Sequence, residues 1–152
     1  MQWNKQDLGQ YFTAEEYIDT LLIPLMQVTF KDQKEMEKSA VQQETGMIFV
    51  REMEKQFKGR IFLMPAYHYL ASEDLSAEVT RLNEWAAKAG ERSFKHVFFF
   101  SFDPHWKKQE RNLEGNLLWM PAIQSGDTQS KETQSIIKNQ VAQLTDLIKT
   151  YW

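Results

Sequence analysis

The chain lacks cysteine and is poor in glycine, and both shortages exclude classes of protein. None of its 152 residues is a cysteine, so disulfides and thiolate metal sites are excluded. Its six glycines form neither a G-x-G-x-x-G nor a G-x-x-x-x-G-K-[ST] motif, so the usual phosphate-binding loops are excluded as well. No apolar run approaches the roughly 20 residues that span a bilayer. We therefore expect a cytoplasmic protein that has no membrane partner.

The chain also has little excess charge and no leader-like start. Lys and Arg number 18 against 21 Asp and Glu, a net charge of -3. This balance argues against a general nucleic-acid binder. Residues 1–7 are followed by no apolar h-region, so we expect no secretory signal peptide.

What the chain does contain is enough apolar material for one domain, which we expect to span residues 1–152. Hydrophobic residues make up 42% of the sequence and aromatic residues 13%. A domain of this size buries roughly 70% of the surface that its unfolded chain exposes. A hydrophobic core can therefore stabilise it without disulfides or metals.

Every proline follows the end of an apolar run. The four are Pro24, Pro65, Pro104 and Pro121. The runs before them are continuous rather than alternating, which is typical of strands buried on both faces. Because proline lacks a backbone N–H, it is a natural strand stop. The pattern therefore predicts a parallel sheet covered by helices.

The order of apolar patterns predicts an α/β fold, a three-layer sandwich of about four mostly parallel strands with helices on both faces. We expect strands near 20–24, 60–65, 96–102 and 116–120, and helices near 40–58, 74–89, 106–113 and 129–150. A flavodoxin-like or half-Rossmann strand order, 2-1-3-4, is favoured, with 3-2-1-4 as the alternative. Only about a dozen residues join the last two strands, near the minimum for a parallel crossover, so an antiparallel last strand stays open.

Local signals mark several element ends. Thr13 begins a capping-box pattern, Asp103 precedes a proline in the manner of an N-cap, and Asp127 or Thr128 suits the cap of the last helix. The polar residues 31–40 are expected to form a loop.

Two further features concern strand and chain ends. The first strand ends at Pro24 or continues beyond it, because apolar residues follow that proline. The aromatic pair Tyr151 and Trp152 is expected to dock on the fold, since the apolar stripe of the last helix already reaches Tyr151. The alternative is that this pair forms part of a subunit or partner interface.

Some segments of the chain resemble those of a known protein family. Residues 16–25 (EYIDTLLIPL), residues 56–66 (QFKGRIFLMPA) and the early Trp3 resemble the YpiF-like family of uncharacterised Bacillus-type proteins. The resemblance covers the whole chain but contains no catalytic signature. It implies a small cytoplasmic bacterial protein with a domain of unknown function, and it supplies no residue roles.

Residues able to bind a ligand follow the second and third predicted strands. Tyr67 and His68 follow Pro65, while Ser101, Asp103, His105 and Trp106 surround Pro104. Ligands of parallel sheets bind outside the carboxyl ends of the strands, so these side chains are expected at one edge. In the order 2-1-3-4, His68 and His105 would face each other across the first strand.

A basic group beside this cluster favours an anionic ligand. It consists of His105, Lys107, Lys108 and Arg111. These residues belong to a predicted helix whose N-terminal N–H groups favour phosphate or carboxylate, and Trp106 could stack on a ring of the ligand. Asp103 counts against this interpretation, because it would occupy the same helix N-terminus.

Two classes of function stay open at this point. The favoured one is a non-catalytic protein that binds a small anionic ligand or a protein partner, including a second copy of itself. The alternative is a hydrolase or metal-assisted enzyme that uses His68, Asp103 and His105. Ser101 is the only nearby nucleophile, yet it sits inside an aromatic run without the G-x-S-x-G elbow, so a small core residue is the simpler interpretation. No cofactor is indicated.

Overall fold

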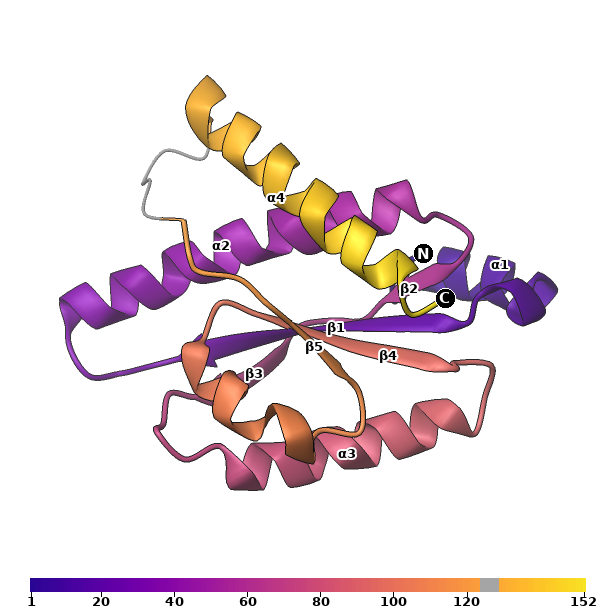
Figure 1. The fold of residues 1–152 in the computed structure, drawn as a ribbon, viewed down its shortest axis with the longest axis horizontal. Coiled ribbons are helices and arrows are strands. Elements are labelled where there is room, and N and C mark those ends of the chain that lie inside the picture. Colours follow the sequence, from indigo (N-terminus) through magenta and orange to yellow (C-terminus); the bar gives the residue numbers. More distant parts are fainter. Residues whose placement is uncertain (124–128) are drawn as a thin grey trace.

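A parallel sheet with helices on both faces forms the centre of the molecule (Figure 1), in a computed structural model that describes residues 1–123 and 129–152. The predicted α/β architecture is confirmed. In chain order the elements are α1 (Lys5–Thr13), the 3₁₀ turn η1 (Glu15–Tyr17), β1 (Thr20–Val28), α2 (Gln33–Gln56), β2 (Ile61–Leu63), β3 (Tyr67–Leu70), α3 (Ser76–Gly90), β4 (His96–Ser101), the 3₁₀ helix η2 (Pro104–Asn112), β5 (Asn116–Trp119) and α4 (Lys131–Lys149).

The strand order is β2-β1-β4-β5, and every pair in it is parallel. This is the predicted order 2-1-3-4, so the alternative order and the antiparallel last strand are both wrong. A fifth strand, β3, pairs with the second half of β1. Because β2 and β3 follow one another along the same edge of β1, the sheet is longer on that side than the sequence predicted.

The first strand continues through its proline. On one edge of β1, the ladder with β2 ends at Leu22 and the ladder with β3 begins at Leu25. Pro24 lies in the gap between these two ladders. Its missing N–H therefore leaves no bond unmade on that edge, and β1 can run on to Val28.

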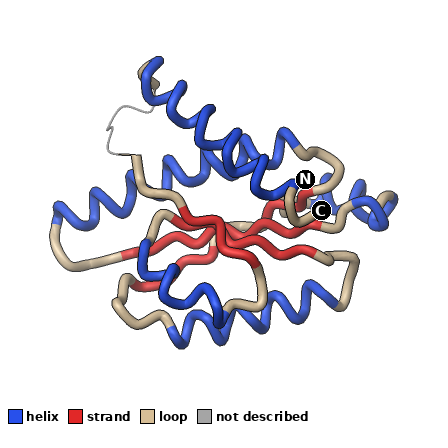
Figure 2. Tube along the Cα trace, in the orientation of Figure 1, coloured by secondary structure: helices blue, strands red, loops and turns tan. Residues whose placement is uncertain are grey.

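Both faces of the sheet are buried, as the continuous apolar runs indicated. Helices α2 and α4 cover one face, while α3 and η2 cover the other (Figure 2). Phe98 and Phe100 of β4 point to the α2 side, and Phe99 between them points to the α3 side. All three rings are 0% exposed, so alternate residues of one strand serve two separate cores.

Two local predictions were wrong, both concerning helix ends. The expected loop at 31–40 is the start of α2, whose N-cap Asp32 accepts a hydrogen bond from Glu35 N at 2.8 Å. The first turns of this helix are exposed, so it needs no apolar stripe there and gave no periodic signal. Thr13 is the last residue of α1 rather than an N-cap, and Asn4 caps that helix by accepting from Asp7 N at 2.8 Å.

Trp152 docks on the fold as predicted, whereas Tyr151 is 43% exposed and meets only Phe98 among the aromatic rings of the described residues, edge-on with 5.4 Å between centroids. The Trp152 indole donates from Nε1 to Thr20 Oγ1 at 2.9 Å and lies 3.8 Å beneath the Arg60 guanidinium. Phe57 meets the same ring edge-on, with 4.6 Å between centroids. At the other end of α4 the cap is Ser130. The predicted caps, Asp127 and Thr128, lie outside the described residues.

Candidate functional site

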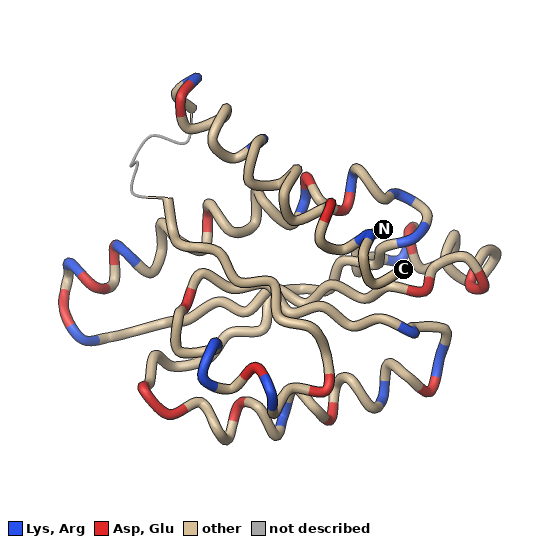
Figure 3. The backbone as a smooth tube through the Cα atoms, viewed as in Figure 1, with Lys and Arg blue, Asp and Glu red and all other residues tan. Residues whose placement is uncertain are grey.

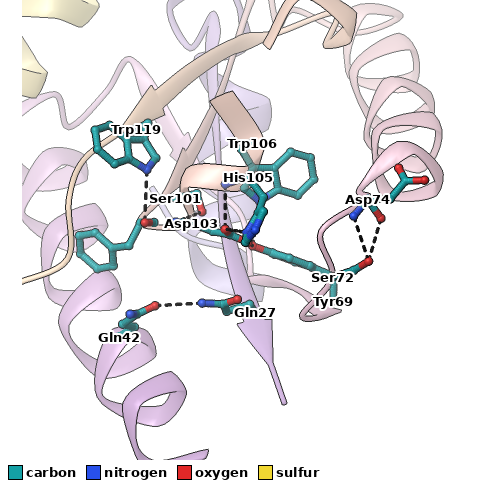
Figure 4. Close-up of polar contacts among 11 residues, drawn as sticks. Gln27, Gln42, Tyr69, Ser72, Asp74, Ser101, Asp103, His105, Trp106 and Trp119 are labelled. Atoms are coloured by element: carbon teal, nitrogen blue, oxygen red, sulfur yellow. Dashed lines mark hydrogen bonds and ion pairs between the residues drawn. The ribbon is translucent and has the colours of Figure 1, made fainter. Parts of the chain in front are cut away.

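Asp103 is the centre of a buried polar network at the carboxyl edge of the sheet (Figure 4). It follows β4, caps η2 as predicted and is 3% exposed. One carboxylate oxygen, Oδ2, accepts a 2.8 Å hydrogen bond from the Tyr69 hydroxyl. The other, Oδ1, accepts from His105 N at 3.0 Å and lies 2.7 Å from His105 Nδ1. Both oxygens of this buried carboxylate are therefore satisfied by the protein itself.

Tyr69 is the member of this network that the sequence did not reveal. It lies on β3, and its hydroxyl accepts a 2.8 Å hydrogen bond from Trp106 Nε1 while donating to Asp103. Burial, together with the charge of Asp103, raises the pKa of Tyr69, so its hydroxyl stays a donor. The alternation of Tyr67 and Tyr69 with more polar or exposed neighbours was the available signal for a short strand.

Trp106 and Ser101 support Asp103 from inside the core. Trp106 is 0% exposed, so it holds Tyr69 and cannot stack on a ligand. Ser101 is 1% exposed, and its hydroxyl accepts from Asp103 N at 2.9 Å. This matches the interpretation of Ser101 as a small core residue.

His105 is the member of this network that lies at the surface. Its side chain is 37% exposed while that of Asp103 is 3% exposed. Because the carboxylate accepts at Nδ1, the imidazole carries its proton on that nitrogen. In the described part of the chain, Nε2 makes no hydrogen bond. The pair therefore fixes the ring through Nδ1 and leaves the Nε2 lone pair free.

His68 does not join this pair. It lies on β3 beside Tyr69, and adjacent residues of a strand point to opposite faces. Tyr69 reaches Asp103 on the α3 side, whereas His68 Nε2 is 2.9 Å from Gln43 Oε1 of α2. The two histidines therefore do not face each other across β1. Within residues 1–123 and 129–152, no three His, Asp or Glu side chains could together hold a metal.

At the N-terminus of each helix that begins at this edge lies an aspartate of the chain itself. Asp32 at α2, Asp74 at α3 and Asp103 at η2 each accept a hydrogen bond from a backbone N–H of the following turn. Hydrogen bonds from the Ser76 hydroxyl and backbone lower the pKa of Asp74. An external anion therefore cannot bind at the N-terminus of η2, because Asp103 occupies it, as the sequence analysis indicated.

The crevice at the switch point of the sheet is closed as well. The chain leaves β1 toward α2 on one face and leaves β4 toward η2 on the other, and ligands of such sheets bind at that reversal. Here the space between Gln27, Gln42 and Ser101 is a cavity of about 10 Å³, which suits one water molecule. A ligand at this edge must therefore bind on the outer surface.

The predicted basic residues lie along η2, where Figure 3 colours the Lys and Arg positions of the backbone blue. In a 3₁₀ helix residues three apart lie in one row, with successive members about 6 Å apart along the axis. His105, Lys108 and Arg111 form such a row, called here the basic row. Lys108 and Arg111 are exposed and make no ion pair in the described part of the chain. Lys107 lies in another row, with its Nζ 3.9 Å from the centre of the Trp119 ring.

Tyr67 lies on β3 on the same face as Tyr69, but another partner holds it. Its hydroxyl donates to Glu78 of α3. Burial, together with this hydrogen bond, raises the pKa of Tyr67 to about 12. The Tyr67 side chain is therefore turned to α3 rather than to the basic row.

An apolar groove lies on the α3 face away from this edge, and the sequence did not predict it. It has a volume of about 440 Å³ and is lined mainly by Trp3, Met64, Trp85 and Phe94. Trp3 is 57% exposed and Trp85 42%. Exposed aromatic surface of this kind is typical of binding sites.

Comparison with known proteins points to one family. The sequence model described as "Protein of unknown function (DUF2487)" matches residues 9–152. The chain is 24% identical over 153 residues to "Uncharacterized protein YpiF" of Bacillus subtilis (strain 168), an alignment that covers 100% of this chain and 98% of that protein. No solved structure matches. None of the described helices is long and apolar enough to cross a membrane.

Proposed function

The chain belongs to the DUF2487 family of proteins of unknown function, and from that premise we propose that it is a non-catalytic cytoplasmic protein that binds a small anionic ligand on the basic row of η2. The ligand is a phosphate- or carboxylate-bearing molecule held outside the carboxyl edge of the sheet. The absence of cysteine agrees with a reducing compartment.

One observation carries this proposal. In a chain with a net charge of -3, Lys108 and Arg111 project from one row of η2 without a carboxylate partner in the described part of the chain. The helix that carries them is anchored, because Asn83 of α3 donates to Asn112 O at 2.9 Å and Trp106 is buried beneath it. Cations without an internal counter-ion attract anions, and a spacing of about 6 Å along an anchored helix lets two of them reach one phosphate.

Calorimetric titration with pyrophosphate, tripolyphosphate and citrate tests this site. We expect binding that the double variant K108A/R111A weakens at least tenfold. The matched control is K34A/K38A, which removes two exposed lysines of α2 and should leave the affinity unchanged. Equal losses in both double variants, or no binding by the unaltered protein at 50 mM salt, would contradict the proposal.

A second candidate, an interaction module, is favoured by the apolar groove. Trp3 and Trp85 line the groove and are themselves exposed, and its volume of about 440 Å³ admits a large apolar side chain. In a two-fold dimer the same patch contacts itself, and tryptophan is enriched at the centres of interfaces. In this second candidate function, the groove therefore binds a second copy of the same chain. Sedimentation velocity over 10–200 µM should show a dimer that W85S abolishes, and a monomer throughout would reject it.

The enzyme alternative receives less support from the geometry. It required His68, Asp103 and His105 at one site, and the structure places His68 on the opposite face of the sheet. Ser101 is buried and hydrogen-bonded to the backbone. Of the original set only the Asp103–His105 pair remains together.

A further inference from the structure

The Asp103–His105 pair has a chemical consequence beyond anion binding. We propose that His105 is a phosphoryl acceptor, modified on Nε2 by a small phosphoryl donor of the acyl phosphate or phosphoramidate class. The proposal rests on the proposed function only in that the basic row holds the phosphate of the donor.

The first argument is the orientation of the imidazole. Asp103 Oδ1 lies 2.7 Å from His105 Nδ1 and also accepts from His105 N at 3.0 Å. The carboxylate itself cannot turn, because Tyr69 donates to its other oxygen and Trp106 donates to Tyr69. The proton of the ring is therefore held on Nδ1, and the lone pair of Nε2 points away from the network. Fixing the tautomer in this way is how buried carboxylates prepare histidines for reaction.

The second argument is the charge beside Nε2. Lys108 and Arg111 follow His105 at intervals of three in the 3₁₀ helix, so their stems stand about 6 and 12 Å further along the same row. The flexible side chain of Lys108, the nearer of the two, can reach a phosphoryl group on Nε2. A cation at that place neutralises charge on the transferring group and on the product.

The phosphoryl transfer involves only the donor, His105 and Asp103, and every bond and charge in it is accounted for. The Nε2 lone pair attacks phosphorus and forms an N–P bond, while the bond from phosphorus to the leaving carboxylate or ammonia breaks and the leaving group takes that electron pair. The Nδ1 proton stays on the ring, where Asp103 stabilises the positive charge that develops. Nothing is oxidised or reduced.

The chain contains its own control for this experiment. His68 is exposed and on the opposite face, and its Nε2 is 2.9 Å from Gln43 Oε1 rather than beside a carboxylate. Incubation with phosphoramidate, followed by ³¹P NMR and mapping of the labelled peptide, should show His105 modified at least tenfold faster than His68. H105Q should lose the rapid signal, and H68Q should keep it.

One further variant tests the role of the carboxylate. D103N has one oxygen where Asp103 has two. With that oxygen accepting from Tyr69, the amide NH₂ group faces His105 Nδ1 and can only donate, so the proton is no longer held on Nδ1. Labelling of His105 should therefore slow at least tenfold while circular dichroism reports an intact fold. Equal labelling of His105 and His68, or no effect of D103N, would overturn the proposal. If pyrophosphate binds but His105 is not labelled, this inference alone fails. If His105 is labelled rapidly although no anion binding is measured, the proposed function alone fails.

Discussion

The hydroxyl of Tyr69 and the carboxylate of Asp103, 34 positions apart in the chain, share a buried hydrogen bond of 2.8 Å. It joins β3, at one side of the sheet, to the residue that starts η2 after β4. Trp106 donates to the same hydroxyl, and Asp103 in turn orients His105. The position of the His105 imidazole therefore depends on a strand that the apolar runs did not reveal.

Removing that hydroxyl should be costly. Tyr69→Phe leaves Trp106 Nε1 and one oxygen of Asp103 without their partner inside the protein, so we expect unfolding free energy to fall by about 1–3 kcal/mol. Urea unfolding followed by circular dichroism measures the change. Tyr67→Phe is the matched control, because Tyr67 is only partly buried and lies outside the network. A control that loses as much as Tyr69→Phe would contradict the importance of the network.

Stability should depend on acid pH through Asp19. Burial by itself raises the pKa of Asp19, but the hydrogen bonds and charge of Arg60, with the Thr20 hydroxyl, outweigh it and leave the pKa below its usual value. The guanidinium makes two bonds to this carboxylate, at 3.0 and 3.1 Å. The unfolded chain then binds the proton more readily than the native one. The stabilisation is therefore complete well above the ordinary value of 3.8 and is lost as the pH falls through it toward the native value.

Urea midpoints between pH 3 and 6 test this dependence. The decline toward low pH should be shallower in Asp19→Asn, and also in Arg60→Gln, which removes the same pairing from the other side. Unchanged slopes in both variants would show that this pair does not contribute.

Two glycines should respond in opposite directions to alanine. A Cβ added at Gly9 in α1 would meet nothing within 4 Å, so Gly9→Ala should stabilise by about 0.4–1 kcal/mol through helix propensity and reduced chain entropy. A Cβ at Gly115 would come within 2.6 Å of a ring carbon of Phe99 and 2.8 Å of Val97 O. Because neither the buried ring nor the backbone can yield freely, Gly115→Ala should cost about 1–3 kcal/mol. Thermal unfolding of the two variants checks the contrast, and equal signs would contradict it.

The docked Trp152 should stabilise the first strand. Trp152→Ala removes the bond to Thr20 and the contacts with Arg60 and Phe57, and we expect a loss of about 1–3 kcal/mol. Phe30→Ala is the control, since its ring is 75% exposed and should change stability by less than about 0.5 kcal/mol. Equal effects in a denaturant titration would show that the last ring only rests on the surface.

The failures of sequence interpretation have local physical causes. The start of α2 at Gln33 is exposed and polar. The helix begins there because Asp32 caps it, and it has no apolar stripe from which its start could be predicted. Only Tyr69 of the four residues of β3 is buried, so this strand gives neither a continuous apolar run nor a convincing alternation. The end of α1 shows the opposite error, because Thr13 fits a capping pattern but ends a helix that Asn4 had already begun.

The sequence by itself determined the α/β class, the four apolar strands and the helix that starts after Asp103, because continuous apolar runs, prolines and caps act over a few neighbouring residues. It left two strand orders open, and the tertiary structure decided between them. Only the tertiary structure decided which side chains meet. Whether His68 or Tyr69 reaches Asp103 depends on the face to which each points, and a shift of one residue in the register of β3 would exchange them. Such long-range pairing comes from the packing of the whole sheet against its helices, and no local pattern encodes it.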